Sequence, residues 1–361
     1  MKKILALFLG ILMAASLISC GNSSSGGAAS GSAAASASAT ASSSAPAASG
    51  DSYKLVIGHV YSEDSLENKQ MSKLKDLIES KTSGKVSVEI YPNEQLGPEK
   101  DLCEQVVMGT LDATFSEGSM WATVTNKPEF GVFGLPFQYS SIDAMNDAIS
   151  NMIRPELGKI AEDTSVIPIS TVGSGFRHVF TVKKPITKLE DFKGLKIRVP
   201  AVTLYVDIFK DLGCNPTTTA FSECYQALQQ GVVDGCEIDI PNCVQQNWQE
   251  CVHYMTYTYH LAALNVVCIN RDKWNSYPAD IQNAITEACK EAEEYSFELR
   301  STADSDYIGK IEAAGVKITK LDSSELARLR AACQPIYDEF EGYGLSDLLN
   351  KIADMNASHQ Q

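Results

Sequence analysis

The chain has 361 residues, with 45 acidic and 30 basic side chains and a net charge of −15 at pH 7. An acidic surface repels nucleic acid and anionic lipid headgroups, so neither is expected as a direct partner of the folded part. The length leaves room for two lobes of ordinary domain size.

The first fifty residues predict export and tethering. Lys2 and Lys3 precede an apolar run over 4–17 that is too short to span a membrane. Leu17-Ile18-Ser19-Cys20 then fits the lipobox, in which signal peptidase cuts before a cysteine that becomes lipid-modified. The alternative is an ordinary signal peptide that happens to contain a cysteine. We expect a signal peptide over 1–19 and a lipid anchor on Cys20.

Residues 20–50 are dominated by glycine, alanine and serine. Such a composition cannot bury apolar surface, so we expect a flexible tether between the anchor and the folded part.

From residue 51 onward, predicted strands and helices alternate. Apolar–polar alternation marks the strands, and longer amphipathic stretches mark the helices. The expected strands are 53–59, 86–91, 111–115, 166–172, 178–182 and 195–199, and the expected helices are 64–80, 98–109, 142–163 and most of 278–314. The glycine-rich segment between 166–172 and 178–182 predicts a turn. This order is typical of parallel sheets covered by helices.

Two features indicate a pair of lobes. The helical segment 278–314 would extend about 50 Å at about 1.5 Å per residue, which is longer than one lobe of this size. The segments 103–113 and 225–235 also echo one another, because each passes from a helix through a glycine and an aspartate into a strand. We expect two lobes built on one plan and braced by a long helix.

Two arginines are the main candidates for a binding site. Arg177 lies in GFRHVF (175–180), and Arg198 lies in KGLKIRVP (193–200) at the end of a predicted strand. A guanidinium held on a strand suits carboxylate recognition, because its planar fork donates two parallel hydrogen bonds. Ligands of open α/β sheets also bind at the carboxyl ends of strands. The alternative for Arg198 is a surface ion pair with an acid such as Asp207.

The segment 175–237, which also contains AFSECYQALQQGVVDGCE (220–237), resembles the solute-binding proteins of tripartite ATP-independent periplasmic (TRAP) transporters, the DctP-like family. The resemblance implies an α/β, two-lobed periplasmic-binding-protein-like fold, with a ligand cleft between the lobes and a long helix spanning both. The expected bounds are 51–174 plus 264–303 for lobe I and 175–263 plus 304–361 for lobe II, with hinges near 172–175 and 259–264.

The resemblance also implies which residues contact the ligand. In the family both arginines bind the ligand carboxylate, at positions matched here by Arg177 and Arg198. Phe221 matches a phenylalanine that packs against the ligand, and Glu117 matches a polar contact from the first lobe. Glu99 matches another first-lobe position, and His59 is expected to line the cleft.

Several positions depart from the family pattern. After VDG the family usually has Gln-Glu-Asn-Pro, whereas this chain has Cys236 followed by Glu237, Ile238 and Asp239, and we expect these last three residues to contact the ligand. Polar ligand contacts of the family correspond here to Val60, Met120 and Ile238. A ligand rich in hydroxyl groups would lose hydrogen bonds against these side chains. The departures therefore favour a smaller or more apolar carboxylate over sialic acid.

Enzyme signatures are absent from the sequence. There is no HExxH, GxSxG, P-loop, GxGxxG or EF-hand motif, and the histidines lack metal-ligand spacing. We expect no enzymatic activity, no cofactor and no metal. An alternative is that Glu223, Glu237 and Asp239 hold a cation that bridges to the ligand, as in some family members.

Nine cysteines follow Cys20 without any CxxC pair. An odd number cannot pair completely, and most of them stand at apolar positions of predicted elements, which favours small buried hydrophobic residues over disulfides.

Together these observations predict an extracytoplasmic, membrane-anchored lipoprotein on the cell surface or the periplasmic face. We expect a monomer that captures an organic acid and delivers it to the membrane permease subunits of a TRAP transporter. Two alternatives stay open: a ligand-sensing lipoprotein that feeds a histidine kinase, and the binding protein of an ATP-driven importer.

Overall fold

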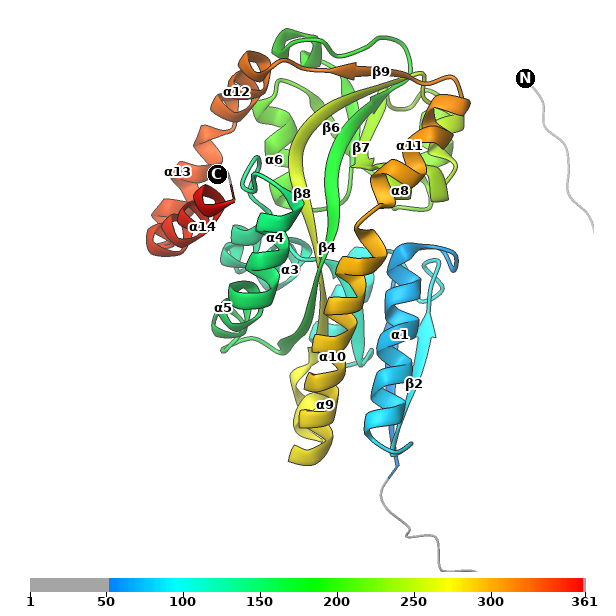
Figure 1. Ribbon diagram of the computed structural model, residues 1–361, viewed down its shortest axis with the longest axis vertical. Helices are drawn as coiled ribbons and strands as arrows, with labels where there is room; N and C mark the ends of the chain where they lie inside the picture. Colours follow the sequence, from blue (N-terminus) through cyan, green and yellow to red (C-terminus); the bar gives the residue numbers. More distant parts are fainter. Residues whose placement is uncertain (1–51, 360–361) are drawn as a thin grey trace, which may run out of the picture. The chain divides into compact units, whose positions relative to one another are not determined.

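The computed structural model describes residues 52–359, which form an α/β fold around one mixed sheet (Figure 1). The predicted signal peptide, Cys20 and the tether lie outside these residues. The strands are β1 (Tyr53–Gly58), β2 (Val86–Tyr91), β3 (Ala113–Glu117), β4 (Val166–Thr181), β5 (Lys196–Val199), β6 (Asn215–Thr218), β7 (Gly235–Asp239), β8 (Tyr254–Asn270) and β9 (Lys317–Lys320). Their order is β2-β1-β3-β8-β4-β7-β5-β6, with β9 paired to β8.

Each end of this sheet is a parallel unit, and two long antiparallel strands join the units. β1 pairs in parallel with β2 and β3, and β5 pairs in parallel with β6 and β7. β3 pairs antiparallel with β8, β8 with β4, and β4 with β7. Figure 1 shows β4 and β8 running together through both units. Read from one end the order is β2-β1-β3-β8, and read from the other it is β6-β5-β7-β4, so the two units have the same arrangement. This agrees with the similarity between segments 103–113 and 225–235 of the sequence.

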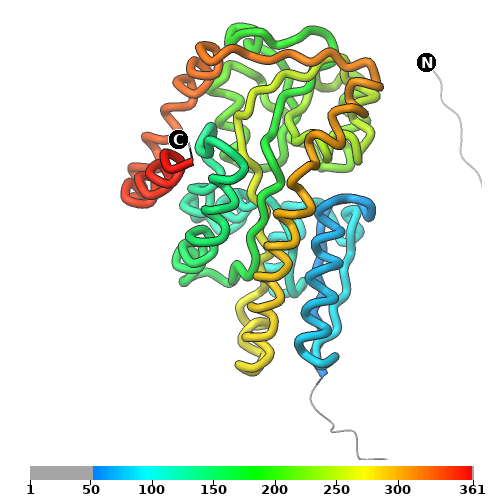
Figure 2. Tube along the Cα trace, viewed as in Figure 1, coloured from blue at the N-terminus to red at the C-terminus, as the bar shows by residue number. Residues whose placement is uncertain are grey.

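The helices lie around the sheet, as the tube in Figure 2 shows. They are α1 (Leu66–Lys81), α2 (Glu99–Met108), α3 (Met120–Thr125), α4 (Ile142–Ala148), α5 (Arg154–Ile160), α6 (Thr203–Asp211), α7 (Cys224–Gln229), α8 (Ile240–Gln245), α9 (Arg271–Asn275), α10 (Ala279–Arg300), α11 (Ala303–Ala313), α12 (Ser323–Ala332), α13 (Gln334–Gly342) and α14 (Ser346–Ser358). Short 3₁₀ segments span Pro128–Gly134, Leu189–Phe192 and Trp248–Glu250, and a π-helical turn spans Ile149–Ile153.

Local sequence explains where the helices begin, end and pack. The Ser65 hydroxyl accepts a hydrogen bond of 3.0 Å from the Asn68 N–H and caps α1. α2 ends before Gly109, whose φ of 75° suits the left-handed cap. Along α10, buried residues recur at the spacing of one helix face, including Ile281, Ile285 and Ala292. That face packs on α1 and β4 and places α10 along the first parallel unit.

The predicted turn between strands 166–172 and 178–182 is wrong. β4 is a single strand of 16 residues that pairs with β8 over its whole length. Glycines often break strands, but here Gly173 and Gly175 lie at an irregularity of the pairing, where Gly175 adopts a φ of 104°. The glycines therefore bend a continuous strand instead of ending it. The sheet is consequently mixed, and only its two end units are parallel.

Two predicted helices are interrupted in the structure. The segment 142–163 consists of α4, a π-helical turn and α5, and Pro155 is the second residue of α5. Proline lacks the N–H that would bond to the carbonyl four residues earlier, which accounts for the irregular turn before it. The segment 278–314 divides into α10 and α11 at Ser301 and Thr302. The brace is therefore two consecutive helices.

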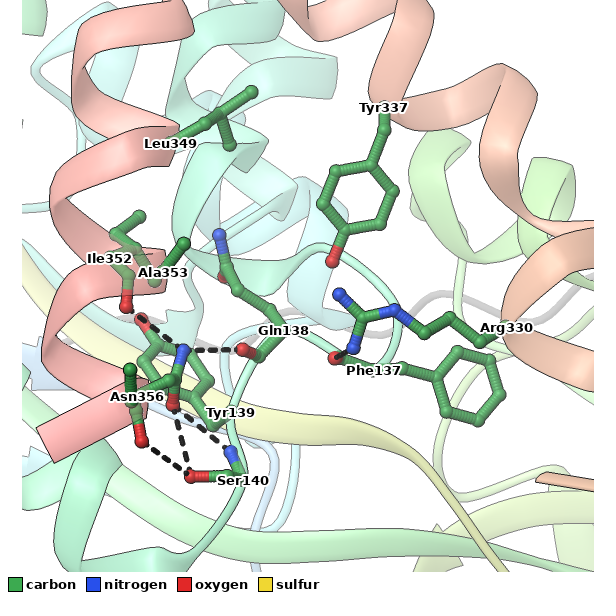
Figure 3. Close-up of a pocket in the computed structure, with 11 residues that line it drawn as sticks. Phe137, Gln138, Tyr139, Ser140, Arg330, Tyr337, Leu349, Ile352, Ala353 and Asn356 are labelled. Atoms are coloured by element: carbon green, nitrogen blue, oxygen red, sulfur yellow. Dashed lines mark hydrogen bonds between the residues drawn. The ribbon is translucent and has the colours of Figure 1, made fainter. Parts of the chain in front are cut away.

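The C-terminal helices α12–α14 contact segments from both predicted lobes. Figure 3 shows Asn356 of α14 bonded to the backbone of Gln138 and Ser140, and the Arg330 side chain bonded to the carbonyl of Phe137. On the other side, Glu325 of α12 accepts a bond of 3.0 Å from the Leu189 N–H. The bounds of the lobes stay a prediction.

Within residues 52–359, no helix combines the length and apolarity that crossing a bilayer requires. The nine cysteines of this region are free thiols, and eight of them are buried, with Cys251 partly exposed.

Replacing Asn356 with alanine should destabilise the protein by about 1–3 kcal/mol, because the buried carbonyl of Gln138 and the partly buried N–H of Ser140 lose their partner. Urea denaturation would measure the loss. Ser358→Ala is the matched control, since Ser358 is exposed and bonds only within its own helix, and it should stay within about 0.5 kcal/mol. Equal effects of the two substitutions would contradict this role of Asn356.

Candidate functional site

A cavity of about 310 Å³ lies where the two parallel units face each other. Most of the predicted ligand-binding residues line it: Arg177, Arg198, Phe221, Glu99, Glu117, Ile238 and Met120. The other lining residues are Val60, Tyr61, Pro98, Lys100, Asp101, Pro200, Ala201, Thr219, Ala220 and Glu223. Residues that are far apart in the sequence thus converge on one site.

Arg198 is the buried cation of this cavity. It lies in β5, is 2% exposed, and donates from Nη2 to the Thr219 carbonyl oxygen at 2.8 Å. Its guanidinium also lies 5.6 Å from the ring centre of Trp248. Among the described residues, no carboxylate forms an ion pair with it. Asp207, the alternative surface partner, instead pairs with Lys210 at 3.0 Å.

Arg177 lines the same cavity, but its guanidinium is already paired with the Glu237 carboxylate. Its Nε donates to Glu237 Oε2 at 2.5 Å, and its Nη2 donates to Glu237 Oε1 at 2.7 Å and to the Glu237 carbonyl oxygen at 3.0 Å. Glu237 is fully buried and does not line the cavity. A ligand would therefore meet Arg177 beside this bidentate pair, while Glu237 holds the guanidinium in position.

The environment keeps Glu237 ionised. Burial alone would raise its pKa, but Arg177 and a hydrogen bond from His260 together hold the pKa below the usual range. The His260 ring nitrogen Nε2 lies 3.4 Å from Glu237 Oε2, and its Nδ1 lies 2.8 Å from the Thr258 hydroxyl. His260 belongs to an irregular stretch of β8 opposite Arg177, in which Tyr259 has a φ of 49°. This stretch directs the imidazole toward the ion pair.

Two carboxyl groups form the opposite wall of the cavity. Glu117 ends β3 and is 5% exposed, and its Oε2 accepts a bond of 2.8 Å from the Ser119 N–H. Glu99 begins α2, and its Oε1 accepts a bond of 2.7 Å from the Glu117 N–H. Burial raises the pKa of Glu99, and burial together with the Glu99 charge raises the pKa of Glu117 to about 8.

Aromatic and apolar side chains complete the lining. Phe221 packs between Tyr61 and Trp248, with ring centres 5.7 Å and 5.2 Å apart. Val60, Met120 and Ile238 add apolar surface, as their sequence positions predict. The Phe221 N–H donates to Glu94 Oε1 at 3.1 Å, so the loop that carries Phe221 is bonded to the opposite unit of the sheet.

Three predicted site residues do not line the cavity. His59 is fully buried and its Nε2 lies 3.1 Å from Asn68 Oδ1. Asp239 caps α8 by accepting a bond of 3.0 Å from the Asn242 N–H. Glu237 lies behind Arg177, as described above. In this structure the side chains of His59, Glu237 and Asp239 form hydrogen bonds with other protein groups.

The alternative cation site also finds no support in the structure. Glu223 accepts a bond from the Ala220 N–H at 3.2 Å, while Glu237 and Asp239 have the partners given above. Residues 52–359 contain no group of three His, Cys, Asp or Glu side chains placed to hold a metal ion.

Sequence reasoning missed Tyr61 and Thr219, which both line the cavity. Tyr61 follows Val60 in the exit loop of the first strand and donates to Asn265 Oδ1 at 3.0 Å. The exit of a strand is a signal that could have identified it. Thr219 accepts bonds from Arg198 through both its carbonyl oxygen, at 2.8 Å, and its hydroxyl, at 3.3 Å, and no motif in the sequence marks it.

Two other cavities contain an arginine whose guanidinium is already engaged. The one in Figure 3, of about 270 Å³, lies between residues 137–140 and the helices α13 and α14, and its Arg330 donates to the Phe137 carbonyl oxygen at 2.8 Å. The other, of about 550 Å³, is lined by Arg300, which donates to Glu67 Oε1 at 2.7 Å. Arg198 is the better candidate for an anion, since its charge has no ion-pair partner in residues 52–359.

Comparison with known proteins identifies the class of this fold and site. The model of the bacterial extracellular solute-binding protein family 7 (DctP) matches residues 57–342. The chain belongs to this family, which consists of substrate-binding proteins and includes the solute-binding components of TRAP transporters.

Individual relatives agree with this assignment. A solute-binding protein of Roseobacter denitrificans is 32% identical over 273 residues, covering 75% of this chain and 82% of the relative. A TRAP periplasmic solute-binding protein of Chromohalobacter salexigens, solved with bound D-glucuronate, is 29% identical with a TM-score of 0.78 and covers 83% of this chain and 99% of its own. One from Sulfurospirillum deleyianum, solved with bound succinate, is 27% identical with a TM-score of 0.76, covering 84% and 99%.

These similarities confirm the predicted two-lobed fold class and the predicted family. They support the TRAP interpretation over a sensor or an ATP-driven importer.

Replacing Glu237 with glutamine should destabilise the ligand-free protein by about 3–5 kcal/mol, because the Arg177 charge would remain buried without its counter-charge. Urea denaturation at pH 7 would measure this loss. Glu190→Gln is the matched control: Glu190 pairs with Arg328 on the surface, and such pairs contribute about 1 kcal/mol or less. A loss at Glu237 no larger than that at Glu190 would contradict the positioning role.

Proposed function

We propose that this protein binds an organic acid through Arg177 and Arg198 and delivers it to the membrane permease subunits of a TRAP transporter. The observation that carries the proposal is the buried Arg198 guanidinium, which faces the cavity without an ion-pair partner among the described residues. A buried charge is costly unless it is paired, so a ligand carboxylate would complete the site.

The solved relatives support a carboxylate as the ligand class. D-glucuronate and succinate are both carboxylic acids, although one carries several hydroxyl groups and the other a second carboxylate. In this chain Val60, Met120 and Ile238 line one part of the cavity, and apolar side chains there favour carbon atoms of the ligand over hydroxyl groups. Phe221 adds an apolar contact next to Arg198. We propose a compact organic acid.

Lobe closure would bring the ligand into contact with both walls. The proposed hinges lie at residues 172–175 and 259–264, where β4 and β8 cross between the parallel units. The irregular pairing at Gly173 and Gly175 and the positive φ of Tyr259 support bending at these points. The proposed lobes are 51–174 plus 264–303 and 175–263 plus 304–361.

The proposed setting is the outside of the cytoplasmic membrane. The family description names extracellular solute-binding proteins, which supports an extracytoplasmic location. We propose that the protein is a monomer held at the membrane by a lipid on Cys20. Mass spectrometry of the purified membrane form would show a lipid-modified cysteine at the N-terminus, and a Cys20→Ala variant should be released from the membrane fraction.

Arg198→Ala should weaken binding of the ligand about 30- to 4000-fold, because loss of one partner of a buried charge pair costs about 2–5 kcal/mol. The ligand would first be selected by thermal shift from a panel of mono-, di- and keto carboxylates and uronates. At about 100 times its dissociation constant it should stabilise the protein by about 2.7 kcal/mol. Calorimetry would then compare the variants.

Arg198→Lys should also bind poorly, since an ammonium cannot make the two parallel bonds of a guanidinium. Arg328→Ala, at an exposed ion pair, is the matched control and should bind like the unmodified protein. A loss below threefold for Arg198→Ala would remove Arg198 from the site.

A further inference from the structure

Glu99 and Glu117 line the cavity, and neither forms an ion pair among residues 52–359. The cations closest along the chain or across the cavity are engaged elsewhere: Arg177 binds Glu237, and Lys100 pairs with Glu104 at 3.5 Å. Each carboxyl has one oxygen bonded to a backbone N–H, namely Oε1 of Glu99 and Oε2 of Glu117. Of the remaining oxygens, Glu117 Oε1 accepts only a long bond of 3.4 Å from the Ser119 hydroxyl.

The charge balance disfavours two ionised carboxylates at this wall. Since Glu237 neutralises Arg177, the Arg198 charge alone would face Glu99, Glu117 and the carboxylate of a bound acid. Several like charges in one buried cavity repel strongly, so a proton on one of them is favoured.

The surroundings select Glu117 as the group that keeps the proton. Burial and the Glu99 charge from α2 raise its pKa to about 8, while Arg177 on β4, Tyr205 on α6 and the Ser119 N–H act in the opposite direction. The pKa of Glu99 is raised by burial, but the bond from the Glu117 N–H and the charges of Arg198 and Arg177 oppose this increase. At neutral pH, Glu117 is the more strongly protonated group.

We propose that Glu117 acts as a neutral acid in ligand binding, with its Oε1–H donating a hydrogen bond to a ligand oxygen remote from the carboxylate at Arg198. The assignment to Oε1 follows from geometry, because Oε2 accepts a bond of 2.8 Å from the Ser119 N–H, whereas Oε1 accepts only a long bond of 3.4 Å from the Ser119 hydroxyl, which can rotate away. This inference rests on the proposed function. It narrows the ligand to an acid with a second oxygen acceptor, such as a hydroxyl, keto or carboxylate oxygen.

An amino acid would require the opposite charge state. Its ammonium group would pair with an ionised Glu117 or Glu99, and its binding would improve as the pH rises. The direction of the pH dependence therefore distinguishes the two classes of ligand.

The sign of the effect follows from linkage. Below about pH 8 the free protein already carries the proton, so the affinity is constant. Above this pH the free protein loses the proton and must regain it to bind, which weakens binding about tenfold for each pH unit. Between pH 7.0 and 9.5 the dissociation constant should rise about thirtyfold.

With one exception, the other titratable groups near the cavity would not change the dissociation constant between pH 7.0 and 9.5. The buried imidazoles of His59 and His260 have lowered pKa values, and so remain neutral. Burial raises the pKa of the Cys224 thiol, but the hydrogen bond to Cys236 and the Arg198 charge lower it. The pKa therefore lies below its usual 9.0. A Cys224→Ser variant separates its contribution.

The test has a ligand-free arm and a ligand arm. Carboxyl ¹³C NMR of the full chain and of Glu117→Gln should reveal one glutamate resonance, absent from the variant, that titrates near pH 8. Calorimetry with D-glucuronate, succinate and the acid selected from the panel should show the thirtyfold weakening between pH 7.0 and 9.5. Glu117→Gln should abolish this dependence, while Cys224→Ser and the surface variant Glu190→Gln should retain it.

The outcomes separate this inference from the proposed function. Acids that bind through Arg198 with an affinity that is flat or rises with pH would overturn the neutral role of Glu117 and leave the carboxylate site intact. A Glu117 resonance that titrates near pH 4.5 would do the same. Failure of every acid to bind, or full binding by Arg198→Ala, would overturn the proposed function and with it this inference.

Discussion

The ion pair between Arg177 and Glu237 connects the central strands of the sheet to the ligand cavity. Arg177 belongs to β4, which runs through both parallel units, and Glu237 belongs to the neighbouring strand β7. Two parallel hydrogen bonds and one to the backbone fix the guanidinium, while His260 of β8 contacts the same carboxylate. Three adjacent strands therefore determine where one positive charge of the site lies. A shift between these strands would move that charge, which connects lobe motion to ligand contact.

The second arginine has a different kind of support. Arg198 is held by the Thr219 carbonyl and by the faces of Trp248 and Phe221, without a carboxylate partner among residues 52–359. Such an arrangement leaves a positive charge available inside a protein whose net charge is −15. The acidic surface would repel an anionic ligand at long range, so binding depends on short-range contacts within the cavity. The neutral form of Glu117 would reduce the remaining repulsion.

Much of the fold could be predicted from the sequence, because strands with alternating apolar residues and capped helices are encoded locally. β2 has the predicted bounds, and α1 and α2 differ from prediction by one or two residues at each end. The continuity of β4 could not be predicted, since it depends on pairing with β8, a strand about ninety residues later in the chain. Only this pairing shows that Gly173 and Gly175 bend the strand.

The same division applies to the site. Arg177, Arg198, Phe221 and Glu117 could be placed from motifs and strand ends, and they do meet in one cavity. Glu237 and Asp239 do not line that cavity, since Glu237 pairs with Arg177 of the neighbouring strand and Asp239 caps α8. Along β7 the buried Glu237 contacts Arg177, while its neighbour Ile238 lines the cavity. Alternation along a strand is predictable, but which face meets the ligand is decided by the pairing of β4, β7 and β8.

The central claim is that the arginines recognise a charged carboxylate, and the most direct measurement compares a bound acid with its own methyl ester. Calorimetry at pH 7 would use the acid selected by thermal shift and its monoester at the carboxyl group that meets Arg198. The ester keeps the carbon skeleton and both oxygens but loses the charge, so its affinity should be at least about thirtyfold lower. Equal affinity for the acid and the ester would contradict the account.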